Sequence, residues 1–518
     1  MKVTLISPYL DTIAQGLRCL SSFIKSKDYE CEMIFLPDYK ALLSYDPQFG
    51  RPYEQSLMDD VVQTCSGSDI VGICVMSNFF DRAVQLSENL RKSLAAPVIW
   101  GGIHPTVSPE ESLNHCDIAC VGEGEYAMLN LLRAMEQKRD YHDIKNLSFR
   151  RNGAVQKNEL EPLILDLDAL PFQDYDYTSH YTATKDGRRL VKMDYEIQKD
   201  QIVNGLRICG GLCVYQTITT RGCPHACAYC CHSALRKLSQ GQKILRRRST
   251  ENVILELEQV KEKMPYVELI LFADESMPAM PAERLKEFCE QYKTRIGLPF
   301  FVQVSPPYMT EEKMDCLVDA GMRCAQMGIQ TGSEEVSRTY YNRNISNDEV
   351  RKGARLLNKH KDRICPPIYD IILDNPYETR EDVLKTVRLL MELPRPFVVQ
   401  FFSLTFYPGT ELYARAKADG FIKDERNTVY RKHYHAFDKS FLNFLVMGAH
   451  YGFPKPLMKL LSNEHVAKVL DRKCLRWSWR LSHQTLKSLK RLLKERHTVG
   501  AAPEPPLRRS VKPEKGGS

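Results

Sequence analysis

The feature that most constrains the fold is an alternation of short apolar segments with amphipathic ones, which occurs twice along the chain. In the first series, the apolar segments "KVTLISP", "CEMIFLP", "DIVGICVMS", "PVIWGG" and "DIACVGEGE" are interspersed with helical patterns at 16–27 and 80–95. This alternation is typical of β–α units whose strands pair in parallel. We therefore predict an α/β domain over residues 1–140, a doubly wound parallel sheet of Rossmann-like type. Its ligand should lie at the carboxyl ends of the strands.

The second series begins near residue 214 and contains six further apolar segments. They are "VYQTITT", "LILFAD", "FFVQVS", "CAQMGIQ", "PIYDIIL" and "VVQFFSL". Helical patterns such as "ENVILELEQVKEKM" and "REDVLKTVRLLMEL" lie between them. Six β/α repeats predict a partial (β/α)6 barrel over residues 206–420, with its active site at the C-terminal ends of the strands.

Three other regions lack this alternation. Residues 141–205 are turn-rich, aromatic and acidic, which predicts a linker packed along a surface or a simple connector. Residues 421–497 have mostly helical patterns, and residues 498–518 have the composition of a disordered tail.

The basic charge of the chain is concentrated at its end. From Arg472 onward there are thirteen Lys and Arg against three Asp and Glu, a net charge of +10 against +7 for the whole chain. The preceding residues are therefore slightly acidic, which argues against a nucleic-acid enzyme. Leucines on one face of this basic segment favour docking on the protein itself, or else contact with a membrane surface or an acidic partner.

The overall composition predicts a globular protein of a reducing compartment. Hydrophobic residues make up 43% and charged residues 26% of the chain, and neither a signal peptide nor an 18-residue apolar span is evident. We therefore expect a cytoplasmic protein with no transmembrane segment. Because its seventeen cysteines are an odd number scattered along the chain, a disulfide framework is not expected, and metal ligation is the better interpretation of any cluster.

One such cluster is "TTRGCPHACAYCCHS", which follows the first predicted barrel strand. Cys223, Cys227 and Cys230 have the spacing Cys-x3-Cys-x2-Cys. Free thiols and a structural zinc site, with His225 or His232 as fourth ligand, are two interpretations. A [4Fe–4S] cluster is a third, in which three thiolates leave one iron open for an exchangeable ligand. No second cysteine pair has the usual zinc spacing, which favours the cluster. The adjacent fourth cysteine is outside the pattern.

This loop resembles the cluster loop of the radical S-adenosylmethionine (radical SAM) superfamily, Cys-x3-Cys-x-aromatic-Cys, with Tyr229 as the aromatic residue. The resemblance implies that the open iron binds the amino and carboxylate groups of S-adenosylmethionine. An electron, delivered by a donor such as ferredoxin or flavodoxin, then produces methionine and a 5′-deoxyadenosyl radical. Tyr229 would lie near the adenine.

Further barrel positions match the superfamily more loosely. In "FADES", Asp274 and Glu275 would meet the methionine amino group, or else cap the next helix. In "MGIQTGSEEV", Gln330 and Thr331 stand where Glu and Ser are common, and both can hydrogen-bond a ribose. Arg343 would pair with the methionine carboxylate.

The motifs "GGIHPTVSPEE" and "CVGEGEYAML" in the first domain, placed before such a barrel, resemble the cobalamin-binding domain of the cobalamin-dependent branch. The resemblance implies two walls of a nucleotide-tail site and a Ser-bearing loop: Gly101, Gly102, His104 and Thr106; Gly122, Glu123, Gly124 and Glu125; and Ser77.

The loop "DTIAQG" departs from the pattern of many cobalamin proteins. Between Asp11 and Gly16, Ile13 occupies the position at which other cobalamin proteins carry a cobalt-ligating histidine. Cobalt bound here would lack a protein imidazole, which favours the nucleophilic Co(I) state. We do not assign His104 as a cobalt ligand. An alternative is that the domain keeps its fold without the cofactor.

The resemblance implies a cobalamin-dependent radical SAM methyltransferase. Co(I) would take a methyl group from one S-adenosylmethionine. The adenosyl radical from a second would abstract hydrogen from an unactivated carbon of a small molecule or peptide, and the substrate radical would take the methyl group. Alternatives are oxidative cyclisation, ring contraction or hydroxylation with the same cofactors, and a non-catalytic cobalamin or iron–sulfur sensor. The sequence identifies no catalytic side chain, and no nucleic-acid partner is expected.

Overall fold

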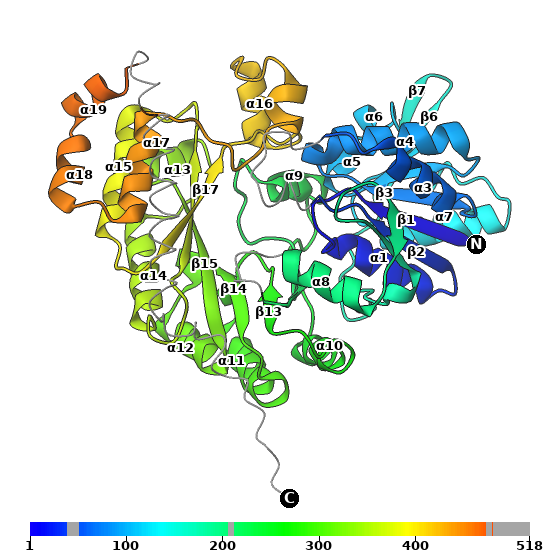
Figure 1. Ribbon diagram of the computed structural model, residues 1–518, viewed down its shortest axis with the longest axis horizontal. Helices are drawn as coiled ribbons and strands as arrows, with labels where there is room; N and C mark the ends of the chain where they lie inside the picture. The colour runs from blue at the N-terminus through cyan, green and yellow to red at the C-terminus, as the bar shows by residue number, and fades with distance from the viewer. Residues whose placement is uncertain (39–50, 206–211, 473–478, 480–518) are drawn as a thin grey trace, which may run out of the picture. The chain divides into compact units, whose positions relative to one another are not determined.

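The computed structural model describes residues 1–38, 51–205, 212–472 and 479. The chain divides into two compact units (Figure 1). The first comprises Met1–Glu268 with Thr405–His433, and the second Leu269–Leu404 with the residues from Tyr434 onward. The predicted disordered tail and the basic segment from residue 473 lie outside the described residues, apart from Trp479.

The first unit contains a nine-stranded sheet in the order β7–β6–β5–β4–β3–β1–β2–β8–β9. The first five strands along the chain are β1 (Lys2–Ser7), β2 (Glu30–Phe35), β3 (Ile70–Cys74), β4 (Val98–Gly101) and β5 (Ile118–Cys120). Each runs parallel to its neighbours within this set, in the order β5–β4–β3–β1–β2. The predicted parallel sheet is confirmed.

Helices cover this sheet, and the longer ones each bury one apolar side. They include α1 (Gln15–Lys25), α3 (Gln55–Cys65), α4 (Phe80–Ser93), α5 (Ile103–Val107), α6 (Pro109–Ser112) and α7 (Glu125–Glu136). Leu17 of α1 and Leu132 of α7 share one core cluster with Val3 and Leu5 of β1. The burial of such side chains contributes about 25 cal/mol per Å² of apolar surface.

Residues 141–205, predicted to be a linker packed along a surface or a simple connector, contain regular secondary structure. This segment adds β6 (Leu147–Arg151), β7 (Ala154–Lys157), β8 (His180–Ala183) and β9 (Leu190–Lys192), followed by α8 (Tyr195–Gly205). β6 and β7 form an antiparallel hairpin whose turn residues, Asn152 and Gly153, both have positive φ angles. Asn-Gly is a strong hairpin signal, so the sequence held this information. The sheet is therefore mixed at its edges.

The barrel region contains six strands in the order β10–β13–β14–β15–β16–β17. They are β10 (Val214–Thr217), β13 (Leu269–Phe272), β14 (Phe300–Val304), β15 (Met322–Gln330), β16 (Ile368–Leu373) and β17 (Val398–Ser403). All six predicted strands are confirmed. The five that belong to the second unit pair in parallel in chain order. Two-residue strands β11 (Thr220–Arg221) and β12 (Arg246–Arg247) form a separate ladder.

Helices separate these strands, as the amphipathic patterns predict. They include α10 (Thr250–Lys263), α11 (Ala282–Gln291), α12 (Glu311–Ala320), α13 (Glu334–Thr339), α14 (Asn347–Lys359) and α15 (Arg380–Glu392). Ser346 and Thr379 begin α14 and α15 with capping boxes, which satisfy backbone N–H groups at the helix start.

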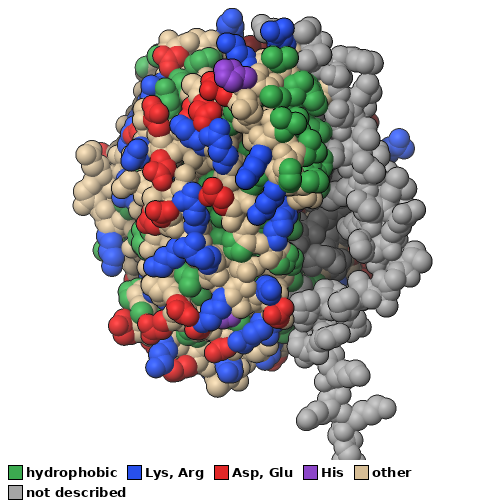
Figure 2. Space-filling view, turned by 90° about the vertical axis from the view of Figure 1, so that its left-hand side faces the viewer, with side chains coloured by type: hydrophobic (Ala, Val, Ile, Leu, Met, Phe, Trp, Pro, Cys, Tyr) green, Lys and Arg blue, Asp and Glu red, His purple; other side chains and the backbone are tan. Residues whose placement is uncertain are grey.

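The described part of the predicted helical region 421–497 contains α17 (Phe441–Tyr451), α18 (Lys455–Leu461) and α19 (Glu464–Leu470), whereas residues 431–440 form no helix. On the face in Figure 2, basic and acidic side chains are interspersed. Ion pairs of the second unit include Arg351–Glu392 and Arg388–Glu381. Among helices of the described ranges, none combines the length and apolar character needed to cross a bilayer.

Candidate cofactor site

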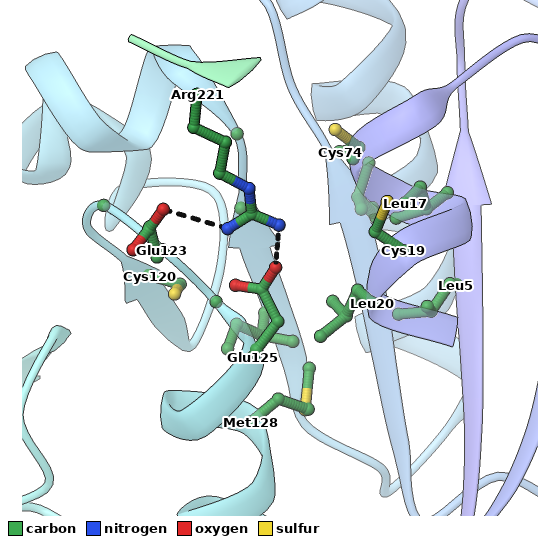
Figure 3. Close-up of a pocket in the computed structure, with 18 of the residues that line it drawn as sticks. Leu5, Leu17, Cys19, Leu20, Cys74, Cys120, Glu123, Glu125, Met128 and Arg221 are labelled. Carbon is green, nitrogen blue, oxygen red and sulfur yellow. Dashed lines mark hydrogen bonds and ion pairs between the residues drawn. The ribbon is translucent and has the colours of Figure 1, made fainter. Parts of the chain in front are cut away.

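A cavity of about 270 Å³ opens in the first unit where its parallel strands end (Figure 3). Gly101 is the last residue of β4 and Cys120 is the last residue of β5, so the strand ends form part of the cavity wall. The cavity is lined by Leu5, Gly16, Leu17, Cys19, Leu20, Gly72, Ile73, Cys74, Ile99, Gly101, Gly102, Cys120, Gly122, Glu123, Gly124, Glu125, Met128, Ile218 and Arg221. This is the position at which open α/β sheets bind ligands.

Seven of the sequence-predicted residues line this cavity: Gly16, Gly101, Gly102, Gly122, Glu123, Gly124 and Glu125. Five others do not: Asp11, Ile13, Ser77, His104 and Thr106. The two glycine-rich loops therefore meet at one site, as the sequence suggested, whereas the polar residues beside them support the loops.

Thr106 ties the two glycine-rich loops together. Its hydroxyl donates to the Gly102 carbonyl at 2.7 Å and accepts from the Gly122 N–H at 3.0 Å. Gly102 has a φ of +95°, and a Cβ there would lie 3.2 Å from Cys74 Sγ. Glycine is therefore required at this position both for its backbone conformation and for space.

His104 packs in the core instead of facing the cavity. It is fully buried, and its Nδ1 lies 3.1 Å from Ser77 Oγ. The rings of Phe80 and Tyr430 pack against it at centroid distances of 4.9 and 5.5 Å. Its Nε2 is 3.7 Å from Glu111, beyond hydrogen-bond range. Burial lowers the pKa of His104 to about 4.

This depressed pKa predicts a pH-dependent stability. The unfolded chain binds a proton at His104 below about pH 6.5, but the folded chain does so only near pH 4, so stability is lost as the pH falls through this window. We expect the free energy of unfolding to drop by about 2 kcal/mol between pH 7 and pH 5 from this group. Urea titrations of wild type and His104→Gln at both pH values measure it; an equal drop in the variant would contradict the assignment.

Arg221 is a charged residue of the cavity lining that the sequence did not predict. Its guanidinium donates to Glu123 at 2.9 Å and to Glu125 at 2.5 Å (Figure 3). Burial would raise the pKa of Glu123, but Arg221, the Ile164 N–H and Arg246 outweigh it and lower that pKa. The arginine follows β10 in the sequence, so only the fold brings it to the two glutamates of the "GEGE" loop.

The cavity fits the nucleotide tail of cobalamin. Its glycines expose backbone, and a Cβ added to Gly101 would meet no atom within 4 Å. Its other walls are largely apolar, with Leu17, Ile99 and Met128 among them. A flat heteroaromatic base attached to a phosphoribosyl chain suits such a mostly apolar slot with a few polar groups. Among the described residues that line it there is no histidine.

Of the "DTIAQG" loop, only Gly16 lines the cavity, and the five residues that precede it do not. Asp11 Oδ1 accepts the Ile13 backbone N–H at 2.9 Å, which forms a local turn before α1. Burial raises the pKa of Asp11, although the Ile13 N–H and Arg18 oppose this shift. The aspartate therefore shapes the loop, and the position of the ligating histidine of other cobalamin proteins holds a half-buried isoleucine.

The cysteine loop lies in the same unit, between β11 and α9 (Cys231–Leu238). Cys223 and Cys227 are buried and Cys230 is half-buried. Cys223 Sγ accepts the His225 backbone N–H at 3.4 Å, a contact that stabilises a thiolate, and the Cys230 N–H donates to the Cys227 carbonyl at 3.0 Å. These bonds hold the loop that carries the three thiols.

The three thiols fit an iron–sulfur cluster better than a zinc ion. Within the described ranges, no group of three or more His, Cys, Asp or Glu side chains could hold a single metal ion. In a [4Fe–4S] cluster each thiolate binds a different iron, so three cysteines do not need to converge on one point. The spacing of Cys223, Cys227 and Cys230 favours the cluster, and their assignment as its ligands stays a prediction.

Gly222 provides a test of how this loop is held. Its φ is +91°, and a Cβ would lie 2.3 Å from the Ile244 carbonyl oxygen. Gly241 has a similar φ of +83° with no atom within 4 Å. We expect Gly241→Ala to cost about 1 kcal/mol of stability from backbone strain, and Gly222→Ala about 2 kcal/mol more from the clash. Urea unfolding and iron per chain after reconstitution measure both; equal losses in the two variants would refute the clash.

The predicted S-adenosylmethionine contacts at the barrel strand ends belong mainly to the second unit. The side chains of Gln330 and Arg343 both lie beside Gly328. A Cβ added to Gly328 would lie 2.7 Å from the Gln330 side-chain nitrogen and 3.4 Å from an Arg343 guanidinium nitrogen. Arg343 donates to the carbonyls of Gly328 and Ile329 at 2.7 and 2.8 Å. Gln330 is thus placed at the end of β15, and the arginine fixes that end.

The other predicted contacts have different settings. Thr331 is buried, and its hydroxyl donates to Glu378 at 2.7 Å. This hydrogen bond also stabilises the barrel. Asp274 is buried and Glu275 exposed, directly after β13. Tyr229 is half-buried in the cysteine loop of the first unit. Their roles toward S-adenosylmethionine stay predictions.

Two family models match this chain, one in the first domain and one in the barrel region. Residues 1–132 match the model of the B12 binding domain, and residues 217–390 that of the radical SAM superfamily. An uncharacterized methyltransferase of Pyrococcus horikoshii is 25% identical over 68% of this chain and 70% of its own length. An anaerobic magnesium-protoporphyrin IX monomethyl ester cyclase of Synechocystis is 25% identical over 36% of this chain and 33% of its own length.

A solved structure has a similar fold. The radical S-adenosylmethionine methyltransferase TsrM from Kitasatospora setae, with cobalamin and a [4Fe–4S] cluster bound, aligns with a TM-score of 0.61 and 17% identity. The alignment covers 81% of this chain and 75% of that one. At this identity the likeness concerns the fold alone.

Proposed function

Because this chain is a radical SAM enzyme that carries a B12-binding domain, we propose that it transfers a methyl group from S-adenosylmethionine to an unactivated carbon of its substrate. The two domains imply three cofactors: a [4Fe–4S] cluster, S-adenosylmethionine and cobalamin. The substrate is a small molecule or a peptide, and a ferredoxin or flavodoxin would supply electrons.

Among the described residues that line the glycine-walled cavity there is no histidine, and Ile13 stands where other cobalamin proteins carry a ligating imidazole; this observation supports the proposal. When bound, cobalamin would supply the reduced, nucleophilic metal that methyl transfer from a sulfonium requires. The similarity to a methyltransferase of Pyrococcus horikoshii supports the same outcome.

When bound, cobalamin supplies a methyl carrier and the cluster supplies the electron that cleaves S-adenosylmethionine. The chain's own residues would hold these groups. Gly101, Gly102 and Gly124 would let the backbone approach the nucleotide tail closely, and Cys223, Cys227 and Cys230 would bind three irons.

The stoichiometry of the products tests the proposal. One S-adenosylmethionine that gives up its methyl group becomes S-adenosylhomocysteine, and a second that is cleaved becomes methionine and 5′-deoxyadenosine. Anaerobically purified protein, loaded with cobalamin and cluster, is incubated with methyl-labelled S-adenosylmethionine, a reductant and a metabolite extract. We expect both products in about equal amounts, with label in a new compound. Production of 5′-deoxyadenosine alone would refute methylation, and neither product would refute the enzyme.

A second candidate is a radical rearrangement without methyl transfer, such as an oxidative cyclisation. The similarity to the Synechocystis cyclase favours it, since that protein carries a matching segment. In this case 5′-deoxyadenosine would form with the extract, S-adenosylhomocysteine would not, and the product would carry no label.

A further inference from the structure

Four polar side chains form a row across the parallel sheet of the second unit: Gln303 of β14, Gln326 of β15, Asp370 of β16 and Gln400 of β17. Gln303 is the register partner of Gln326, and Asp370 is that of Gln400. Gln326 Nε2 donates to both carboxylate oxygens of Asp370, each at 2.9 Å. The register and these bonds make the four residues one continuous polar row.

The row lies on the face of the sheet opposite the helices. Met327 points toward α14, because a Cβ added to Gly353 of that helix would lie 3.1 Å from the Met327 sulfur. Side chains alternate along a strand, so Gln326 faces the other way. In a (β/α) barrel that other face is the interior. All four row residues are half-buried, whereas barrel interiors are commonly packed with branched apolar side chains.

The row contains a buried hydrogen-bond acceptor that lacks a donor. Gln400 Oε1 is buried and has no partner among the residues that the structure describes. Burial raises the pKa of Asp370 to about 7, although the Gln326 bond and Arg343 oppose this shift. Arg343 itself donates to the carbonyls at the end of β15. A buried acceptor without a donor is destabilising, so a ligand that brings donors is favoured here.

An aromatic side chain, Phe402, lies on the same face of the sheet as these acceptors. Phe402 follows Gln400 by two residues on β17 and therefore shares its face of the sheet. Its ring is half-buried and stacks on His435 at a centroid distance of 5.0 Å. A planar group lying against Phe402 could present its N–H groups to the neighbouring acceptors.

We infer that the row Gln303–Gln326–Asp370–Gln400 is the substrate anchor, and that it binds a planar group with two or more N–H donors, such as an amidine, a guanidine or an N–H-bearing ring. The inference rests on the proposed function, since the anchored molecule is the one whose carbon is methylated. Asp370 and Gln400 would accept the donors, and Gln326 would hold the carboxylate in place.

Benzamidine, an aromatic ring with an amidinium, is a direct probe that needs no turnover. Its dissociation constant is measured by titration calorimetry on the full-length protein with its cofactors. We expect benzamidine to bind wild type and benzoate not to bind at the same concentration. Asp370→Asn and Gln400→Leu should weaken binding by at least roughly tenfold, and Gln400→Glu should strengthen it by adding a second carboxylate.

Asp362→Asn, the same change at an exposed carboxylate, is the matched control and should bind as wild type does. The inference is overturned if wild type does not bind benzamidine, if benzoate binds equally well, or if Asp370→Asn and Gln400→Leu bind like wild type. Should either variant unfold, the benzamidine affinity of Gln400→Glu still tests the inference. A row with a purely structural role would not bind benzamidine more tightly after this change. Benzamidine binding without S-adenosylhomocysteine formation would refute methylation and keep the anchor.

Discussion

Replacement of Cys227 by alanine is expected to abolish the iron–sulfur cluster and the cleavage of S-adenosylmethionine that depends on it. Loss of one of three thiolates leaves an iron without its protein ligand, and even outer-shell changes at metal sites cost 10–100-fold in affinity or activity. We therefore expect more than about a 100-fold loss of 5′-deoxyadenosine formation. Iron and sulfide per chain and the visible absorption of the reconstituted protein report the cluster directly.

Cys231 provides the matched control for this variant. It is the next cysteine after Cys230, begins α9, and is half-buried. Because it lies outside the Cys-x3-Cys-x2-Cys spacing, Cys231→Ala should keep its iron and its activity within about twofold of wild type. If Cys227→Ala retained a full complement of iron, or if Cys231→Ala lost it, the assignment of the three ligands would be wrong.

Replacement of Gly101 by leucine is expected to weaken cobalamin binding without unfolding the protein. A Cβ at this position meets no atom within 4 Å, and the φ of Gly101 is not in the left-handed region, so the side chain can extend into the cavity of about 270 Å³. It would then occupy the space of the ligand. Overpacking costs about 1–3 kcal/mol, which corresponds to roughly ten- to hundredfold weaker binding. Equilibrium dialysis with cobalamin measures the dissociation constant.

Gly67→Leu is the matched control, because Gly67 is exposed, has no atom within 4 Å of an added Cβ, and does not line the cavity. It should bind cobalamin as wild type does. Thermal unfolding of both variants in the absence of cobalamin should be near wild type. Unchanged affinity in Gly101→Leu would show that the nucleotide tail binds elsewhere.

The sequence determined the parts of this protein that depend on neighbouring residues. Strand and helix patterns have periods of two and 3.6 residues, so the six barrel strands and the five parallel strands of the first domain could be predicted. The spacing of Cys223, Cys227 and Cys230 is also local, since one loop carries all three. Glycines after strands likewise marked the two loops of the cavity.

Tertiary structure alone decided the contacts between residues far apart in the chain. Arg221 meets Glu123 and Glu125 across about a hundred residues, and no local pattern encodes that pairing. Asp370 and Gln400 become neighbours only through strand register. His104, beside two cavity glycines in sequence, turned out to be a core residue, because a helix turns its side chain away from the strand end. Periodicity reports which face of an element is buried, whereas the partner across that face depends on how the elements pack.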